Sequence, residues 1–216
     1  MQSMAYVSPS SAVSDPGPRR PRRSLVLTSL AFIALEAGIE SAAGIWGYVF
    51  LTAGRGLSRD VAGAWVSAYW AMMLLGRMVL GPVAERVGAS KVLAASALAT
   101  AAGAGLMTLA GPTTVVVAGF LFIGLGTAAI FPLFTLTTPE RMGGFDAGAA
   151  TRAVSLQVAM AAVGGAALPA GIGVVIGLLE ARALASSLLV LGVAMCALYG
   201  VLCRLAGGGA AGQTYR

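Results

Sequence analysis

The chain has 216 residues, of which 58% are hydrophobic and only 10% are charged. A soluble domain carries about 25% charged residues, so this chain has too few charges to cover a surface that faces water. The composition excludes a soluble enzyme, a disordered chain and a nucleic-acid-binding protein, and it predicts an integral membrane protein that contacts lipid. The formal net charge of +6 therefore needs an explanation other than nucleic acid.

The first 24 residues differ from the rest of the chain. Prolines at positions 16, 18 and 21 disfavour regular structure, and four arginines follow one another closely between positions 19 and 23. We predict a disordered, basic, cytoplasmic tail over residues 1–24. A cleaved signal peptide is disfavoured, because the apolar run that follows is too long and more such runs come after it. Residues 25–205 are predicted to form a transmembrane bundle and residues 206–216 a cytoplasmic C-terminal tail.

After the tail, long apolar segments alternate with short polar ones. Each apolar segment has about the 20 residues that a helix needs to cross a bilayer core about 30 Å thick. Two segments contain a proline, Pro132 or Pro169, which membrane helices tolerate and which often marks a kink. The predicted fold is therefore an all-α membrane protein with six transmembrane helices. The predicted spans are Leu25–Leu51, Val61–Leu80, Val92–Ala110, Thr114–Leu136, Ala153–Leu178 and Ala183–Cys203.

Basic residues are distributed unevenly between the two sides of these spans. With the N-terminus inside, eleven of the fourteen lysines and arginines lie on the cytoplasmic side. This bias explains the net charge, and it predicts an inner or plasma membrane protein with both termini in the cytoplasm. The inside set is Arg19, Arg20, Arg22, Arg23, Arg77, Arg86, Lys91, Arg141, Arg152, Arg204 and Arg216, and the outside set is Arg55, Arg59 and Arg182.

Metal ligands are scarce in this sequence. There is no histidine, and the only cysteines are Cys196 and Cys203. A zinc site needs three or four such ligands close together, so we predict neither a metal site nor a cofactor. On a helix the two cysteines lie about two turns apart, which is farther than a disulfide usually spans, so both are predicted to be free thiols.

Two acidic residues, Glu36 and Glu40, lie within the first predicted span. Because they are four residues apart on a helix, they face the same side, near the middle and the outer half of the bilayer. Charged side chains at this depth are costly and usually functional. Two close carboxylates disfavour ionising together, so the pair is a candidate proton or cation site in a polar cavity. The alternative is a pair of protonated acids hydrogen-bonded into the bundle.

Trp46 follows the two acids on the same predicted helix. On a straight helix it points about 120° away from Glu40, so it joins the acid site only if Gly38, Gly44 and Gly47 bend the helix. The alternative role for Trp46 is that of an aromatic anchor at the outer membrane interface.

The segment that follows the second predicted span carries the most specific motif in the chain. An acid, Glu85, lies among basic residues and can pair with Arg77 or Arg86, while Gly81 and Gly88 permit a sharp chain reversal. We predict that this segment is a conformational latch at the cytoplasmic surface.

This motif resembles the cytoplasmic loop signature of the major facilitator superfamily, glycine-x-x-x-acid-arginine-x-glycine, which joins the second and third helices of each six-helix half. The matching residues are Gly81, Ala84, Glu85, Arg86, Gly88 and Lys91.

Further stretches are similar to the C-terminal half of the fucose–proton symporter-like branch of that superfamily. The residues from Gly38 to Trp46 resemble its seventh helix, those from Ala62 to Arg77 its eighth, and those from Gly124 to Pro132 its tenth. The resemblance covers residues 25–205. It implies that Gly124, Thr127, Phe131 and Pro132 line the same cavity as Glu40, so the candidate solute and proton site comprises Glu36, Glu40, Trp46, Thr127 and Phe131.

The resemblance implies half of a twelve-helix fold, and hence a half-size secondary transporter of a small polar solute, with a sugar and proton symport as the specific candidates. One bundle alone would expose its acids to lipid, so we expect a second six-helix bundle, either another copy or a separately encoded half. The alternatives are a membrane scaffold or regulatory subunit that does not transport, and a half-transporter for drug or metabolite efflux. An intramembrane enzyme is disfavoured, because the sequence offers no histidine base and no glycine-flanked serine.

Overall fold

The computed structural model describes residues 23–141 and 147–210, and all of the secondary structure within them is helical. Six stretches are long and apolar enough to cross a membrane, which confirms the predicted fold class. Nearly all of the predicted N-terminal tail lies outside the described residues. The elements are α1 (Arg23–Val49), η1 (Phe50–Gly54), α2 (Arg59–Val87), α3 (Ala89–Thr108), α4 (Thr113–Thr127), α5 (Ile130–Leu136), α6 (Thr138–Arg141), α7 (Ala147–Leu179) and α8 (Ala183–Ala210).

Several helix ends differ from the prediction, and α7, for example, begins at Ala147 and not at Ala153. The first span extends beyond Leu51, because α1 continues into one π-helical stretch, η1. Helix α2 continues through Gly81 and Pro82 to Val87, so the segment predicted as a loop is mostly helical. Helix α8 reaches Ala210, which shortens the predicted C-terminal tail; residues 211–216 lie outside the described part of the chain.

The fourth span is broken into α4 and α5 before its C-terminal third. Pro132 lies in the first turn of α5, where its missing N–H is tolerated. The same missing donor cannot bond to the carbonyl four residues earlier, at Ala128, and the turn between the two helices lies there. Pro169, in contrast, lies within a continuous α7.

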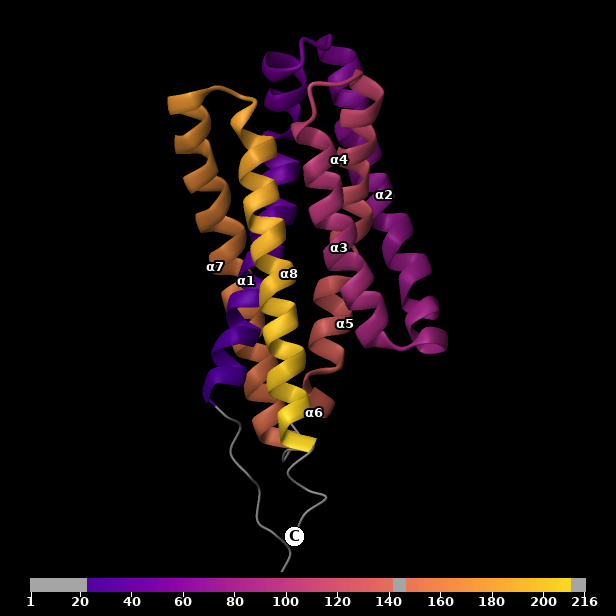
Figure 1. The fold of residues 1–216 in the computed structure, drawn as a ribbon, viewed down its shortest axis with the longest axis vertical. Helices are drawn as coiled ribbons and strands as arrows, with labels where there is room; N and C mark the ends of the chain where they lie inside the picture. The colour runs from indigo at the N-terminus through magenta and orange to yellow at the C-terminus, as the bar shows by residue number, and fades with distance from the viewer. Residues whose placement is uncertain (1–22, 142–146, 211–216) are drawn as a thin grey trace, which may run out of the picture.

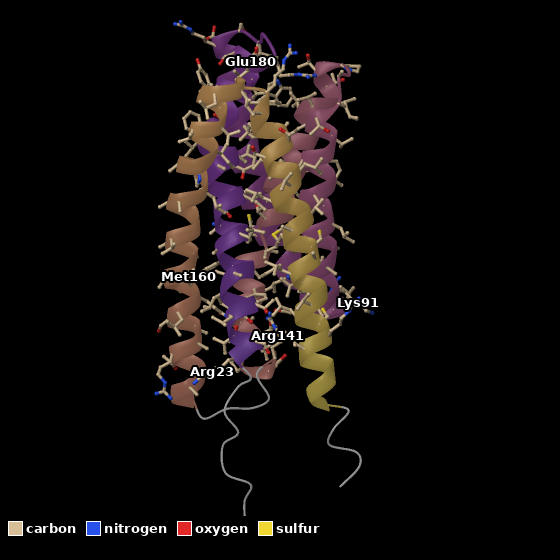
Figure 2. All side chains as sticks on the ribbon, turned by 60° about the vertical axis from the view of Figure 1, so that its left-hand side comes forward. Arg23, Lys91, Arg141, Met160 and Glu180 are labelled. Carbon is tan, nitrogen blue, oxygen red and sulfur yellow. The ribbon has the colours of Figure 1, made fainter. Side chains whose placement is uncertain are left out.

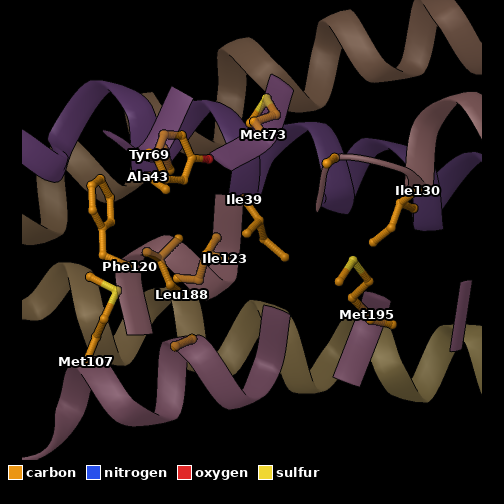
Figure 3. Close-up of a cluster of buried hydrophobic side chains, with 14 of the residues drawn as sticks. Ile39, Ala43, Tyr69, Met73, Met107, Phe120, Ile123, Ile130, Leu188 and Met195 are labelled. Carbon is orange, nitrogen blue, oxygen red and sulfur yellow. The ribbon is translucent and has the colours of Figure 1, made fainter. Parts of the chain in front are cut away.

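The helices run roughly parallel and antiparallel in one bundle, with α1 packed extensively against α7 and α3 against α4 (Figure 1). The centre of the bundle is apolar and aromatic. Tyr69 of α2 stacks on Phe120 of α4, with ring centroids 4.7 Å apart. Figure 3 shows these two side chains among buried residues of α1 and α8 such as Ile39 and Leu188.

The start of α1 and the end of α8 lie at the same end of the bundle, as an even number of spans requires (Figure 1). Arg23 and Arg141 lie near this end and Glu180 at the other (Figure 2). Two arginines of the Glu180 end donate to backbone carbonyls: Arg55 donates to the Gly111 oxygen at 3.0 Å, and Arg182 donates to the Gly54 oxygen at 2.9 Å. These two arginines therefore tie neighbouring connections together.

Candidate functional site

The two acids of α1 occupy neighbouring turns near the middle of the helix. Glu36 is almost fully buried, with 1% of its surface exposed, and Glu40 is partly buried. The glycines around them lie where neighbouring helices approach α1 closely. A side chain at Gly38 would overlap Leu168 of α7, and one at Gly44 would come within 2.6 Å of the Trp70 ring of α2. These glycines let α1 approach its neighbours closely, and the helix is continuous through both acids.

A cavity of about 470 Å³ opens beside these acids. Helix α7 forms one wall, where only small side chains face α1, and this absence of bulk leaves the space open. The cavity lies among α1, α2, α5 and α7. It is lined by Glu36, Ala37, Glu40, Ser41, Arg77, Phe131, Ala161, Ala162, Gly165 and Ala166.

Arg77 belongs to this cavity and not to the cytoplasmic segment where the sequence analysis placed it. Its Nη2 lies 3.5 Å from Oε1 of Glu40 and also contacts the Met73 sulfur. Because α2 continues for ten residues beyond Arg77, the guanidinium lies about 15 Å before the helix end. The cytoplasmic set of basic residues therefore falls from eleven to ten, still against three outside, so the expected orientation is unchanged.

Glu36 has a different environment. Its Oε1 is buried and has no hydrogen-bond partner in the described part of the chain. A buried carboxylate oxygen without a donor is costly, so this atom needs either a proton on the carboxyl group or a donor from a bound molecule.

Of the residues expected from the tenth helix of the resembled branch, only Phe131 lines the cavity. Thr127 is fully buried behind it, and its hydroxyl donates to the Ile123 carbonyl at 3.0 Å. Thr127 also lies beside the hydroxyl of Tyr69, which donates to the Glu40 backbone oxygen at 3.1 Å. Gly124 packs against the backbone of Tyr69. Thr127, Tyr69 and Gly124 thus form the layer that supports Glu40 from behind.

Trp46 does not line the cavity. Its indole N–H donates to the Pro169 carbonyl at 2.8 Å, and its ring packs against Gly173. It therefore joins α1 to α7, a role that neither alternative from the sequence included. Helix α1 is unbroken through Gly38, Gly44 and Gly47, and Trp46 is not among the residues that line the cavity.

The remaining residues of the predicted latch lie at the junction of α2 and α3. Glu85, Arg86 and Gly88 are exposed, and within the described residues Glu85 has no ion-pair partner. Gly88 makes the reversal alone, with a φ of 99°, while Gly81 is an ordinary helical residue. The reversal therefore needs one glycine and not two.

Another cation, the partly buried Arg141 in α6, was counted in the sequence only as a topology signal. Its guanidinium carbon lies 3.8 Å from the centroid of the Phe134 ring, and its Nη2 donates to the Phe134 carbonyl at 2.8 Å and to the Thr137 hydroxyl. Burial lowers the pKa of Arg141. These contacts hold α6 against the end of α5, outside the cavity.

Arg77 was assigned to the latch and not to the cavity, and the small residues of α7 were not recognised as site residues. The signal for Arg77 was its position within the second predicted span, Val61–Leu80, where a charge is unusual. The run of alanine and glycine in α7 could not be distinguished from ordinary helix packing, because small residues serve both purposes.

Comparison with known proteins identifies the fold. No family model matches the sequence, and no curated protein matches it. The structure is similar to a solved structure of the peptide transporter POT, a mutant in complex with alafosfalin, with a TM-score of 0.70 and 18% identity. The match covers 84% of this chain and 38% of that one. This chain has the fold of part of that transporter. It spans well under half of the transporter's length.

Proposed function

We propose that the chain is half of a secondary transporter that moves a small polar solute in a proton-coupled cycle. The observation that carries the proposal is the cavity that holds a buried carboxyl with a free oxygen, Glu36, beside the ion pair of Glu40 and Arg77. Ionisable groups at membrane depth usually mark a proton or solute pathway. Their position among four helices of a half-transporter fold supports a solute site.

The proposed working unit contains two six-helix bundles. Only 17% of the residues in the most apolar windows of α2 and of α7 are buried, against 61% in the span that contains α4 and α5. The cavity lies between these two outer helices, and half of the Arg77 side chain is exposed. Lipid cannot solvate the exposed guanidinium and the polar opening of the cavity, so a second bundle is expected to cover them. A second copy or a separately encoded half would allow alternating access around the cavity.

We propose the α2–α3 junction, with Gly81, Glu85, Arg86 and Gly88, as the cytoplasmic latch of this cycle. Arg77 has no part in it, since its partner is Glu40. A latch acts on the rate of the conformational change and not on the cavity itself. The Glu85→Ala variant is therefore expected to slow transport while it leaves solute binding unchanged.

Proton-coupled transport is tested in proteoliposomes that contain a trapped pH-sensitive dye. Neutral sugars, zwitterionic amino acids and dipeptides, and amines are added in turn, and the internal pH is followed. We expect one class to drive a proton flux that is lost in Glu40→Gln. In that variant the Glu36 carboxylate and the Arg77 guanidinium remain in the cavity, and their charges cancel without a bound proton.

Glu180→Gln, which removes an exposed carboxylate outside the cavity, is the matched control and should keep the proton flux. A well-folded protein for which no solute class moves protons, alone or with a second half, would instead support the scaffold role.

A further inference from the structure

The charges that line the cavity do not balance. Two carboxylates, Glu36 and Glu40, face one guanidinium, that of Arg77. With both acids ionised, the cavity carries one uncompensated negative charge in a region of low dielectric constant, which is costly. One further positive charge is therefore needed, and either a proton or a bound cation can supply it.

The further positive charge is needed at Glu36 and not at Glu40. The Glu40 carboxylate already has Arg77 at 3.5 Å, whereas the buried Oε1 of Glu36 has no donor among the described residues. A ligand that satisfies this atom must bring an N–H or O–H group. A charged donor makes the stronger hydrogen bond to a carboxylate and also supplies the missing charge.

The surroundings of Glu36 contain few other ionisable groups. Glu40 on α1 and Arg77 on α2 are its charged neighbours, and the Tyr69 phenol of α2 lies behind Glu40. Helices α5 and α7 contribute Phe131 and small apolar residues to the cavity.

The ionisable side chains of α8 are engaged elsewhere or exposed. The hydroxyl of Tyr199 donates to the Ser90 carbonyl at 2.8 Å, Cys196 contacts the Ala97 carbonyl, and Cys203 and Arg204 are exposed. No described group other than Arg77 is therefore placed to neutralise Glu36.

The rest of the cavity suits an organic cation better than a metal ion. Hard metal ions take six or more oxygen ligands, and no cluster of three metal-binding side chains occurs in the described part of the chain. Phe131 instead contributes an aromatic side chain to the cavity that Glu36 lines. Aromatic faces attract ammonium groups, and a volume of about 470 Å³ admits a small amine with an apolar body.

We propose that this cavity binds a small primary ammonium compound whose cationic group takes the place of a proton on Glu36. The ammonium donates to the free Glu36 oxygen and lies against Phe131, while Glu40 stays paired with Arg77. When the ammonium enters, the Glu36 proton leaves, so the cavity keeps the same net charge in both states. Either the proton or the ammonium group is bound to Glu36, and never both, so the proton and the amine are exchanged across the membrane. This exchange step rests on the proposed transport function.

The binding test compares three probes of similar shape on the purified chain in nanodiscs: phenethylammonium, the neutral 2-phenylethanol, and zwitterionic phenylalanine. Affinities are measured by calorimetry between about pH 6 and pH 9, where the probe amine stays protonated through most of the range. We expect phenethylammonium to bind tightest. Its affinity should rise up to about tenfold per pH unit while a proton competes for Glu36, with about one proton released per amine bound.

Several outcomes would overturn the proposal. They are no binding of phenethylammonium, an affinity for it that is independent of pH with no proton released at any pH, and equal or tighter binding of the alcohol or of phenylalanine.

Two variants locate the site. Glu36→Gln should weaken phenethylammonium binding by at least about tenfold and remove its pH dependence, because the charged acceptor is gone. Glu180→Gln should bind as the wild type does.

If Glu36→Gln does not fold, as judged by its melting curve, Phe131→Leu keeps the proposal testable. It should weaken ammonium binding on the order of fivefold with little effect on the alcohol. Equal losses for both probes in Phe131→Leu would count against the assigned cation contact.

Proteoliposomes then separate this inference from the proposed function. A phenethylammonium gradient should drive protons in the opposite direction, above the background of Glu36→Gln vesicles, which corrects for passive amine leak. Binding with proton release but without flux would keep the ammonium site and refute transport. Proton flux driven by a sugar or by phenylalanine alone would keep transport and refute the ammonium site.

Discussion

The guanidinium of Arg77 lies 3.5 Å from a carboxylate oxygen of Glu40, although the two residues belong to different helices and lie 37 positions apart. This pair is the one ion pair within the described residues, and it lines the cavity, where half of the Arg77 side chain is exposed. Its surroundings make each charge depend on the other. Changes to either residue should therefore alter both the stability of the bundle and its protonation.

Arg77→Gln should make the stability of the bundle sensitive to pH. Without the guanidinium, Glu36 and Glu40 share a cavity with no compensating charge, so both favour the protonated form. As pH rises the acids must ionise in the bundle or the bundle must open, and stability falls. We expect a loss of about 1–2 kcal/mol at neutral or higher pH, less than for a fully buried pair because Arg77 is half exposed.

Melting curves in detergent from acidic to basic pH measure this effect. Arg59→Gln, an exposed arginine at the start of the same helix, is the matched control and should follow the wild type. If the melting temperatures of Arg77→Gln and Arg59→Gln changed with pH in the same way, Arg77 would not be the group that neutralises the acids.

Gly164→Ala should destabilise the contact between α1 and α7. A Cβ atom at Gly164 would overlap the Ala34 carbonyl oxygen, which is backbone and cannot rotate away. Overpacking of this kind costs about 1–3 kcal/mol. Gly171→Ala on the same helix meets nothing within 4 Å and is the control. Thermal melting of both variants tests the helix register, and equal melting temperatures would contradict it.

Gly88→Ala should destabilise the α2–α3 junction, whereas Gly81→Ala should not. Gly88 has a φ of 99°, which an alanine adopts at a cost of about 1 kcal/mol or more. Gly81 is helical with open space around it, so alanine there should be neutral or slightly stabilising. Melting temperatures and the rate of proton flux check this pair. A loss at Gly81 equal to that at Gly88 would mean that the reversal involves both glycines.

A cysteine at the cavity rim should crosslink to a second bundle. Ala166 is exposed beside the cavity, so Ala166→Cys, with Cys196 and Cys203 replaced, should form a disulfide with a second copy or with a partner half. Gly44 is unsuitable for this purpose because a side chain there meets Trp70.

The control for this crosslink is Ala102→Cys on α3, a helix that contributes no residue to the cavity. We expect crosslinked species on gels of membranes for Ala166→Cys and few for Ala102→Cys. A protein that transports but crosslinks at neither position, and whose mass in nanodiscs is that of a monomer, would refute the two-bundle unit.

The sequence by itself determined the membrane class, the number of spans and the placement of Glu36 and Glu40 on one face of one helix. These follow from local properties: an apolar stretch of about 20 residues must be satisfied as a helix in lipid, and two acids four residues apart must share a helix face. The motif around Gly88 likewise marked the α2–α3 reversal. None of these predictions requires knowledge of which helices are neighbours.

Only the tertiary structure decided what faces the acids. Arg77 is closer in sequence to Glu85 than to Glu40. Because α2 continues through Pro82, however, Arg77 lies well before the end of the helix and pairs with Glu40. Trp46 and Thr127 turned out to support the helices behind the cavity, because their polar atoms found backbone carbonyls there. The cavity itself exists because α7 presents alanine and glycine to α1, and such small residues acquire a function only through the helix packed opposite them.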